Sequence, residues 1–208
     1  MSGSAEEFAR LFDVSRETLD RLRAYEALLA KWNAAINLVS PATLGETWAR
    51  HFIDSAQLFG AAEQLPAYWA DLGTGGGFPG LVIAIMAFEK APQMRMTLVE
   101  SDKRKAAFLL TVIKQFGLNA TVCAERIEVL SPLGADIVTA RALAPLDKLL
   151  AFAQRHLNAE GEAMFLKGSR WEEEVASARK SWSFSCETRQ SLTQPEAVIL
   201  KIKGLHRV

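Results

Sequence analysis

A glycine-rich turn constrains this chain more than any other feature of its sequence. Residues 70–80 read A-D-L-G-T-G-G-G-F-P-G, with five glycines in eleven positions. The apolar stretch at residues 68–72 predicts a buried strand before the turn, and the run at residues 81–91 predicts a helix after it. Glycine admits left-handed backbone and close approach by a ligand. This order of strand, turn and helix is typical of a ligand site at the carboxyl edge of an α/β sheet.

The rest of the chain alternates between predicted strands and predicted helices, which indicates a mostly parallel sheet with helices on both faces. We expect further strands at residues 94–99, 121–124, 135–139, 162–166, 184–188 and 197–203, and further helices at residues 103–116, 146–157 and 172–178. The last two strands have no helix between them, which predicts an antiparallel pair at one edge. We therefore predict an α/β fold with a seven-stranded, Rossmann-like sheet of the S-adenosylmethionine-dependent methyltransferase type, rather than a nicotinamide-binding sheet.

The N-terminal part of the chain is predicted to be helical. Residues 4–37 carry apolar side chains at spacings of three and four, and Ser4 with Glu7 matches a capping box. Pro41 ends this helix, and a second, shorter one is expected at residues 44–58. We expect residues 1–64 to form an N-terminal helical segment packed on a methyltransferase domain at residues 65–208, with the two parts making one compact unit.

Charge and composition narrow the possible partners. The 208 residues carry 24 Lys and Arg against 24 Asp and Glu, so a general electrostatic nucleic-acid binder is not indicated and any polyanion site must be a local patch. The longest apolar run, residues 81–88, is too short to span a bilayer, and the polar N-terminus is unlike a signal peptide. Cys123 and Cys186 have no metal or redox spacing. We expect a cytoplasmic monomer without a metal ion or a membrane partner.

The turn contains a literal G-x-G-x-x-G at Gly75, Gly77 and Gly80, which is the pattern of dinucleotide-binding folds. However, these three glycines do not stand at the distances from the strand that dinucleotide binding requires. Gly73 and Gly75 follow the strand directly, and the matching third position is Phe78. The literal match therefore begins two residues late. In a methyltransferase the glycines would instead let the backbone reach the methionine part and the ribose of the cofactor, which carries no phosphate.

Residues around the turn also favour a sulfonium cofactor. Asp71 would repel a pyrophosphate but suits a cofactor with a sulfonium and an ammonium group, and Pro79 lacks the N–H that a phosphate cradle uses. Glu100 ends the second strand, where its carboxylate can accept hydrogen bonds from both ribose hydroxyls. We predict S-adenosylmethionine as cofactor, with Asp71, Gly73, Gly75 and Glu100 in its site. A tight turn without a ligand and a solvated Glu100 stay open as alternatives.

Taken together, these residues make nearly the whole chain resemble a known family, ribosomal RNA small subunit methyltransferase G, also called glucose-inhibited division protein B. Its most specific pieces are W-N-x-x-I-N-L at residues 32–38 and G-F-P-G at residues 77–80; others are R-H-F-I-D-S at 50–55, E-S-D-K-R-K at 100–105, R-I-E at 126–128 and R-A at 141–142. The resemblance implies an enzyme that transfers a methyl group to N7 of one guanine in 16S rRNA of the small ribosomal subunit.

The resemblance also implies roles for single residues. Gly73 and Phe78 would contact the cofactor from the first loop, and Ile127 and Glu128 would flank its adenine. Arg141 would line the site near cofactor and substrate, and we predict it as the catalytic residue. Many members have Ser directly before this arginine, where Ala140 stands here, and the segment at residues 128–141 is short.

The sequence lacks the motifs of methyltransferases that act on other positions of a base, which agrees with methylation at guanine N7. Guanine N7 has a lone pair and no proton to remove, so its methylation needs positioning and electrostatics rather than a strong base. Amino-group methyltransferases usually carry an Asn/Asp-Pro-Pro-aromatic motif after the fourth strand, and cytosine-C5 enzymes use a cysteine there; this chain has T-A-R-A-L-A-P-L. Arg141 could donate to guanine O6, bind a phosphate or hold the cofactor carboxylate. It could also be a solvated charge at a strand end.

Basic residues that could bind RNA occur in short groups. Lys103, Arg104 and Lys105 open a helix, where positive charge opposes the macrodipole, although a solvated helix start explains them equally well. Lys167 and Arg170 are also predicted to bind RNA. The remaining candidates are Lys201, Lys203 and Arg207, together with Arg50 and His51, which could face the site; His51 is equally well explained as a structural histidine.

Three other functions compete with an rRNA guanine-N7 methyltransferase. A methyltransferase of the same fold could act on another RNA, a small molecule or a protein. A nicotinamide oxidoreductase is disfavoured by the frame of the turn. A non-catalytic binder with a vestigial pocket is disfavoured by the presence of Gly73, Gly75, Glu100 and Arg141.

Overall fold

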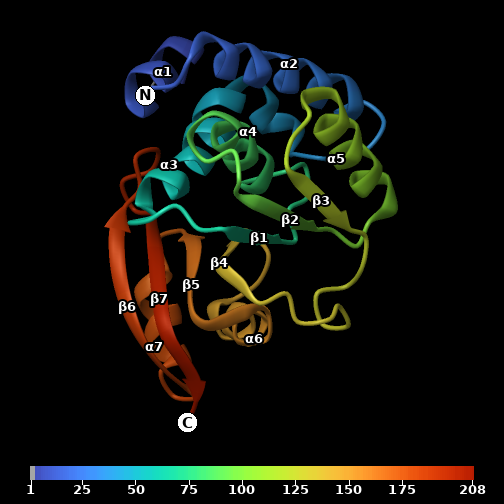
Figure 1. Ribbon diagram of the computed structural model, residues 1–208. Coiled ribbons are helices and arrows are strands. Elements are labelled where there is room, and N and C mark those ends of the chain that lie inside the picture. Colours follow the sequence, from blue (N-terminus) through green and yellow to red (C-terminus); the bar gives the residue numbers. More distant parts are fainter. Residues whose placement is uncertain (1–2) are drawn as a thin grey trace.

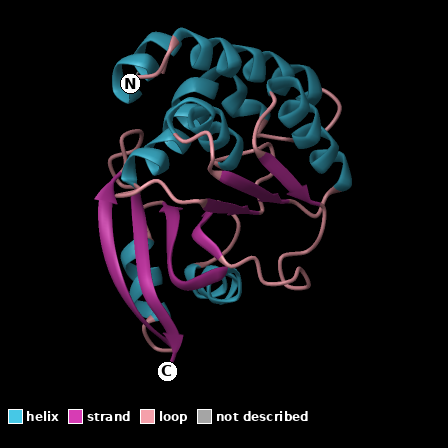
Figure 2. Cartoon of the chain, viewed as in Figure 1, coloured by secondary structure: helices cyan, strands magenta, loops and turns pink. Residues whose placement is uncertain are grey.

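Seven strands form one open, twisted sheet between two layers of helices (Figures 1 and 2). The computed structural model describes residues 3–208. The strands are β1 Tyr68–Leu72, β2 Arg95–Val99, β3 Ala120–Cys123, β4 Ala135–Arg141, β5 Leu157–Lys167, β6 Trp182–Gln190 and β7 Val198–Arg207. Their order across the sheet is β3-β2-β1-β4-β5-β7-β6.

Five strands run parallel, and the C-terminal pair supplies the antiparallel part. β7 lies between β5 and β6 and runs antiparallel to both. The expected α/β architecture with an antiparallel pair at one edge is therefore confirmed. The order of the parallel strands reverses between β1 and β4, which are hydrogen-bonded neighbours. This switch point is where sheets of this type bind ligands.

Alternate residues of the strands face two separate hydrophobic clusters, one on each side of the sheet. Trp69 and Leu98 belong to the cluster beneath the N-terminal helices, α4 (Gly80–Lys90) and α5 (Lys103–Phe116). Their neighbours Ala70 and Val99 belong to the cluster covered by α6 (Leu146–His156) and α7 (Trp171–Ala178). Figure 1 shows the two helical layers on opposite faces. The same alternation along β4 directs Arg141 toward the N-terminal helices.

The predicted helix at residues 4–37 is two helices. The capping box is present, because Ser4 Oγ accepts the Glu7 N–H at 3.2 Å, and α1 spans Ala5–Phe12. Asp13 then adopts a left-handed backbone with φ 47° and ends α1. Ser15 caps the second helix, α2 (Arg16–Asn33), and its hydroxyl also bonds the Glu89 carboxylate of α4 at 2.6 Å. A contact between segments distant in sequence thus adds to the local caps at the break.

The region predicted as one helix at residues 44–58 contains three kinds of helix. A 3₁₀-helix spans Pro41–Glu46, a π-helix spans Trp48–Ile53, and the α-helix α3 spans Asp54–Ala61. Single π-helical turns within helices are frequently found at functional sites. Here the turn carries the R-H-F-I-D-S segment.

The other predicted elements lie within a few residues of the observed ones, and the largest difference is at β5. Its first residue is Leu157 rather than residue 162, because it also pairs with Ala135 before the register shifts at Ile137. None of the helices within residues 3–208 combines the length and the apolar character that crossing a membrane requires.

Candidate active site

The glycines of the turn serve two different purposes. Gly73 and Gly75 have φ values of 66° and 58°, in the left-handed region that favours glycine. Gly77 and Gly80 are needed for packing, because a Cβ there would collide with Leu81 and Leu98 respectively. Of the three glycines in the literal G-x-G-x-x-G, Gly75 therefore lines a cavity, whereas Gly77 and Gly80 are required for packing. The pattern is thus not a functional dinucleotide motif, as its position two residues late after the strand suggested.

A cavity of about 370 Å³, called here the loop cavity, lies beyond the carboxyl ends of β1 and β2. Its lining includes five residues predicted for the cofactor and one predicted for RNA: Gly73, Gly75, Glu100, Ile127, Glu128 and Lys105. Leu143 also lines it, and a Cβ on Gly73 would be 2.5 Å from Leu143 Cδ1. Glycine at position 73 thus lets the segment after β4 close over the turn.

Glu100 is held in a fixed orientation at the end of β2. Its Oε2 accepts the Gly75 N–H at 3.0 Å, and its Oε1 accepts the Asp102 N–H at 2.8 Å. Each carboxylate oxygen can accept more than one hydrogen bond, so both retain acceptor capacity. A carboxylate anchored in this way in the lining of a cavity fits a ligand with a vicinal diol, such as a ribose.

The turn after β3 also lines the loop cavity, and side chains of α6 hold this turn in place. The Ile127 carbonyl accepts a hydrogen bond from His156 Nε2 at 3.0 Å, and the Leu130 carbonyl accepts two from the Arg155 guanidinium, at 2.9 and 3.1 Å. Ile127 is 8% exposed and presents an apolar surface to the cavity. An apolar side chain and an anchored carboxylate in the lining of one cavity suit a nucleoside.

Asp71 contacts the loop rather than lining the cavity. The residue is fully buried, its Oδ2 accepts the Gly80 N–H at 2.9 Å, and its Oδ1 accepts the Thr139 hydroxyl at 2.9 Å. Burial raises the pKa of this carboxyl to about 6, against the opposing effects of its hydrogen bonds and of Arg141. These contacts tie the start of α4 to β1 and β4. A contact between Asp71 and a cofactor stays a prediction.

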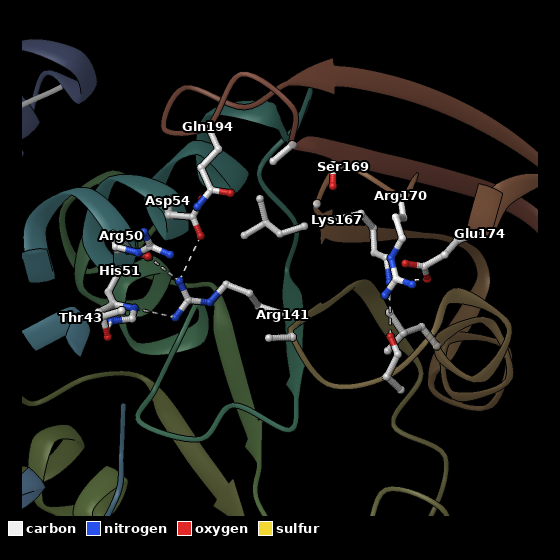
Figure 3. A pocket seen from close by; sticks show the side chains of 16 residues that line it. Thr43, Arg50, His51, Asp54, Arg141, Lys167, Ser169, Arg170, Glu174 and Gln194 are labelled. Atoms are coloured by element: carbon white, nitrogen blue, oxygen red, sulfur yellow. Dashed lines mark hydrogen bonds and ion pairs between the residues drawn. The ribbon is translucent and has the colours of Figure 1, made fainter. Parts of the chain in front are cut away.

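Arg141 lines a second cavity of about 480 Å³, called here the arginine cavity (Figure 3). Three acceptors hold its guanidinium. Nη1 donates to the Arg50 carbonyl at 2.8 Å and to Asp54 Oδ2 at 3.0 Å, and Nη2 lies 3.1 Å from His51 Nδ1. All three acceptors belong to the π-helical turn or the first residue of α3. The two cavities adjoin, because Ala144 lines both.

Phe78 connects the glycine turn to this arginine. The Arg141 Cζ atom lies 5.1 Å from the centre of the Phe78 ring, and the His51 ring stacks on the same phenyl at 4.8 Å. Phe78 is 4% exposed and is not among the residues that line the loop cavity. Its geometry is that of a support for Arg141, and its predicted contact with the cofactor stays a prediction.

A family model described as "rRNA small subunit methyltransferase G" matches residues 18–202. The chain belongs to this family. A member from Ruegeria sp. (strain TM1040) is 52% identical over 196 residues, which cover 94% of this chain and 95% of that protein. Another, from Parvibaculum lavamentivorans, is 50% identical over 205 residues and covers 97% and 90%. The resemblance found in the sequence motifs is thereby confirmed, and the chain is a methyltransferase by family.

Solved structures agree with this family at the level of the fold. A methyltransferase from Geobacter sulfurreducens superposes with a TM-score of 0.60 at 15% identity over 96% of each chain. The structure of M. jannaschii TYW2 in complex with AdoMet superposes with a TM-score of 0.58 at 15% identity, over 84% of this chain and 80% of that one.

The five residues predicted to bind RNA fall into two separate groups. Lys105 lines the loop cavity, Lys103 is exposed nearby, and Arg104 is paired with Asp102 at 3.0 Å. Lys167 and Arg170 line the arginine cavity, where Lys167 is paired with Glu174. Among residues 3–208, no partner is recorded for the exposed Arg170 guanidinium.

Other basic candidates are less accessible than their sequence positions suggested. The Lys201 side chain is 1% exposed and lies within 4 Å of three carboxylates, those of Glu63, Glu162 and Glu187. Burial in this acidic cluster gives Lys201 a structural role in the sheet. Lys203 is exposed but also pairs with Glu162, at 3.6 Å.

Asp54, Thr43 and Gln194 also line the arginine cavity, and no role was predicted for them. A usable signal was present for Asp54. It follows Arg50 and His51 at spacings of four and three in a segment otherwise made of buried apolar residues, so the three polar groups share one side of the helical turn. Thr43 and Gln194 had no such signal, because they come from a 3₁₀-helix and from the link between β6 and β7.

Proposed function

We propose that this chain transfers a methyl group from S-adenosylmethionine to N7 of a guanine in 16S rRNA of the small ribosomal subunit. The observation that carries the proposal is the junction of the two cavities at Ala144: the loop cavity, lined by Glu100 and Ile127, adjoins the arginine cavity, lined by Arg141. The curated relatives are named for small-subunit ribosomal RNA, which supplies the substrate class.

The residues of the loop cavity would bind both the adenosine part and the methionine part of the cofactor. Glu100 would accept hydrogen bonds from the ribose hydroxyls, and Ile127 would cover the adenine. The backbone of Gly73 and Gly75 would lie against the methionine part. When bound, S-adenosylmethionine supplies a methyl group on a positively charged sulfur, which leaves as a neutral thioether.

The groups of the arginine cavity suit an acceptor that needs no deprotonation. Its carboxylates are already paired: Asp54 with Arg141 at 3.0 Å, and Glu174 with Lys167. Both nitrogens of His51 are also engaged, one with Arg141 and one with Thr43. Among these lining residues, all within the described part of the chain, we find no free base. Guanine N7 attacks with its own lone pair and needs none.

We further propose that the protein works as a monomer in the cytoplasm and without a metal ion. Within residues 1–64, of which residues 1 and 2 lie outside the described part, a helical segment would support the site, and residues 65–208 would form the methyltransferase domain. Lys103, Arg104 and Lys105 on one side, and Lys167 and Arg170 on the other, are the proposed contacts with RNA phosphates.

The first test uses small ribosomal subunits from cells that lack this protein, incubated with the purified chain and S-adenosylmethionine labelled in its methyl group. We expect the label to enter 16S rRNA, and cleavage chemistry specific for N7-methylguanine to cut at one place. Label in a different base would contradict the N7 assignment. Absence of label, with cofactor binding intact, would support the alternative of another acceptor.

A further inference from the structure

The hydrogen bonds around Arg141 determine which nitrogen of His51 carries its proton. A guanidinium has five N–H donors and no acceptor, so the His51 Nδ1 atom, 3.1 Å from Arg141 Nη2, must accept. On the other side, the Thr43 hydroxyl donates to the Ser40 carbonyl at 2.9 Å and leaves its lone pairs for His51 Nε2, also at 2.9 Å. Both contacts require the neutral imidazole with its proton on Nε2.

Asp54 is fixed equally well. Its Oδ2 accepts from Arg141, while its Oδ1 accepts from the Thr193 hydroxyl at 2.9 Å and from Gln57 Nε2 at 3.0 Å. The side chains of Arg141 and Asp54 are only 16% and 17% exposed, so water screens their attraction weakly. The pair therefore carries almost no net charge as seen from the cavity.

Three of the five N–H donors of Arg141 are occupied by these contacts, with Arg50, His51 and Asp54. The Nε–H and one N–H of Nη2 have no recorded partner among residues 3–208. Figure 3 shows the acceptors gathered on one side of the guanidinium, away from Lys167 and Arg170 across the cavity. The occupied donors thus fix how the two remaining ones are aimed.

We infer that His51 and Asp54 are positioning residues, which aim the two free donors of Arg141 at the acceptor base and neutralise its charge. The inference rests on the function proposed above. Methylation at N7 leaves the purine positively charged, and an unpaired guanidinium beside it would oppose that change. Paired with Asp54, Arg141 can donate hydrogen bonds to guanine O6 without adding net charge. His51 must stay neutral for the same reason.

The first arm of the test is NMR on the whole protein and needs no RNA. The chain has three histidines, His51, His156 and His206, so the ring nitrogens can be assigned by single substitutions. Near neutral pH we expect the nitrogen chemical shifts of His51 to show that Nε2 is protonated and that Nδ1 is unprotonated. Thr43→Val, which removes the acceptor for Nε2, should weaken this preference. A proton on Nδ1 of the native chain would overturn the inference, whatever RNA the protein methylates.

The second arm is kinetic and compares two substitutions of one residue. His51→Leu removes the acceptor, and we expect kcat to fall about 100-fold, the effect of a misaimed group, with little change in KM for RNA or in cofactor affinity. His51→Asn keeps an oxygen near the Nδ1 position and should recover much of the loss. Thermal unfolding of both variants distinguishes a loss of activity caused by misfolding from one caused by a wrongly oriented Arg141. Equal kcat losses in two folded variants would contradict a role of the acceptor.

A double-substitution cycle decides whether His51 acts through Arg141. In a chain that already carries Arg141→Ala, His51→Leu should lower kcat no further, because there is no guanidinium left to aim. Asp54→Asn should behave in the same way. Losses that multiply independently would assign these residues a separate function and would overturn the inference, while leaving the proposed reaction intact.

Discussion

Backbone conformation, rather than lack of space, requires glycine at position 75. A Cβ there would meet nothing closer than the Gly73 carbonyl at 4.0 Å, yet φ is 58°. Position 77 also has positive φ, but a Cβ there would meet the Leu81 side chain. Single glycines of one loop are thus constrained for different reasons, and only those at the cavity edge bear on ligand binding.

Substitution of Gly75 should therefore affect the ligand more than the fold. Aspartate tolerates left-handed backbone better than most residues, so Gly75→Asp should fold, while its carboxylate would lie near that of Glu100. We expect the Kd for S-adenosylmethionine to rise at least about tenfold, measured by calorimetry. Gly117→Asp is the matched control, since Gly117 has φ 63° and open space but lies outside both cavities. Unchanged affinity in Gly75→Asp would refute the assignment of the loop.

His51 should make the folded chain less stable in acid. Burial, followed by the charges of Arg141 and Arg50, lowers its pKa from 6.5 to about 3. The unfolded chain binds this proton where the folded chain excludes it, so the free energy of unfolding falls as the pH drops from 6.5 toward 3. Asp71 acts in the opposite direction: its pKa is raised to about 6, so the folded chain binds a proton more readily and gains stability on acidification.

The two effects can be separated with one variant. We expect His51→Asn to lose less stability than the native chain between about pH 7 and about pH 5, measured by urea unfolding. Asp71 is the same in both chains, so its contribution cancels in the difference. Parallel pH profiles for the two chains would show that His51 is not buried in its neutral form.

At the scale of helices and strands, the sequence predicted what depends on neighbouring residues. Apolar runs located β1 at Tyr68–Leu72 and α5 at Lys103–Phe116 with the observed bounds. The break between α1 and α2 was missed; part of what holds it is the bond between Ser15 and Glu89, 74 positions apart. The ion pair that holds Arg141 was missed for the same reason, since its partner Asp54 is 87 positions away in the sequence. Such contacts leave no local pattern in a single sequence.

Helix α2 contributes to the glycine turn through one hydroxyl. Tyr25 is fully buried, and its Oη donates a short hydrogen bond to the buried Gly76 carbonyl. Tyr25→Phe would leave this carbonyl without a partner, so we expect a loss of about 1–3 kcal/mol in the free energy of unfolding. Tyr68→Phe is the control, because Thr97, the partner of that hydroxyl, also has Thr121 within 3.3 Å. Equal losses would contradict a specific role of α2 at the turn.

For the molecule as a whole, the zero net charge means that RNA must be held by local groups. Basic residues flank both cavities, and Arg170 at the rim of the arginine cavity is exposed and has no recorded partner among residues 3–208. Lys167, in contrast, is already paired with Glu174. Arg170 is therefore the residue of this rim best placed to contact a phosphate.

The salt dependence of RNA binding tests this assignment. We expect affinity for the small subunit to fall with salt, and Arg170→Ala to reduce the slope of log K against log salt by about 1. Arg16→Ala is the control: it removes the same charge from α2, at a side chain that is 89% exposed and lines neither cavity. A slope unchanged by Arg170→Ala would remove this residue from the RNA interface.

The three acceptors of Arg141 also set an order of events during synthesis. Arg50, His51 and Asp54 are translated 87 to 91 positions before the arginine they hold. A growing chain therefore carries its acceptors long before the guanidinium emerges, and the site closes only when β4 has paired beside β1. Methyl transfer at a correctly aimed arginine thus begins as a late event in the life of each molecule, after the first third of the chain has met the start of the last third.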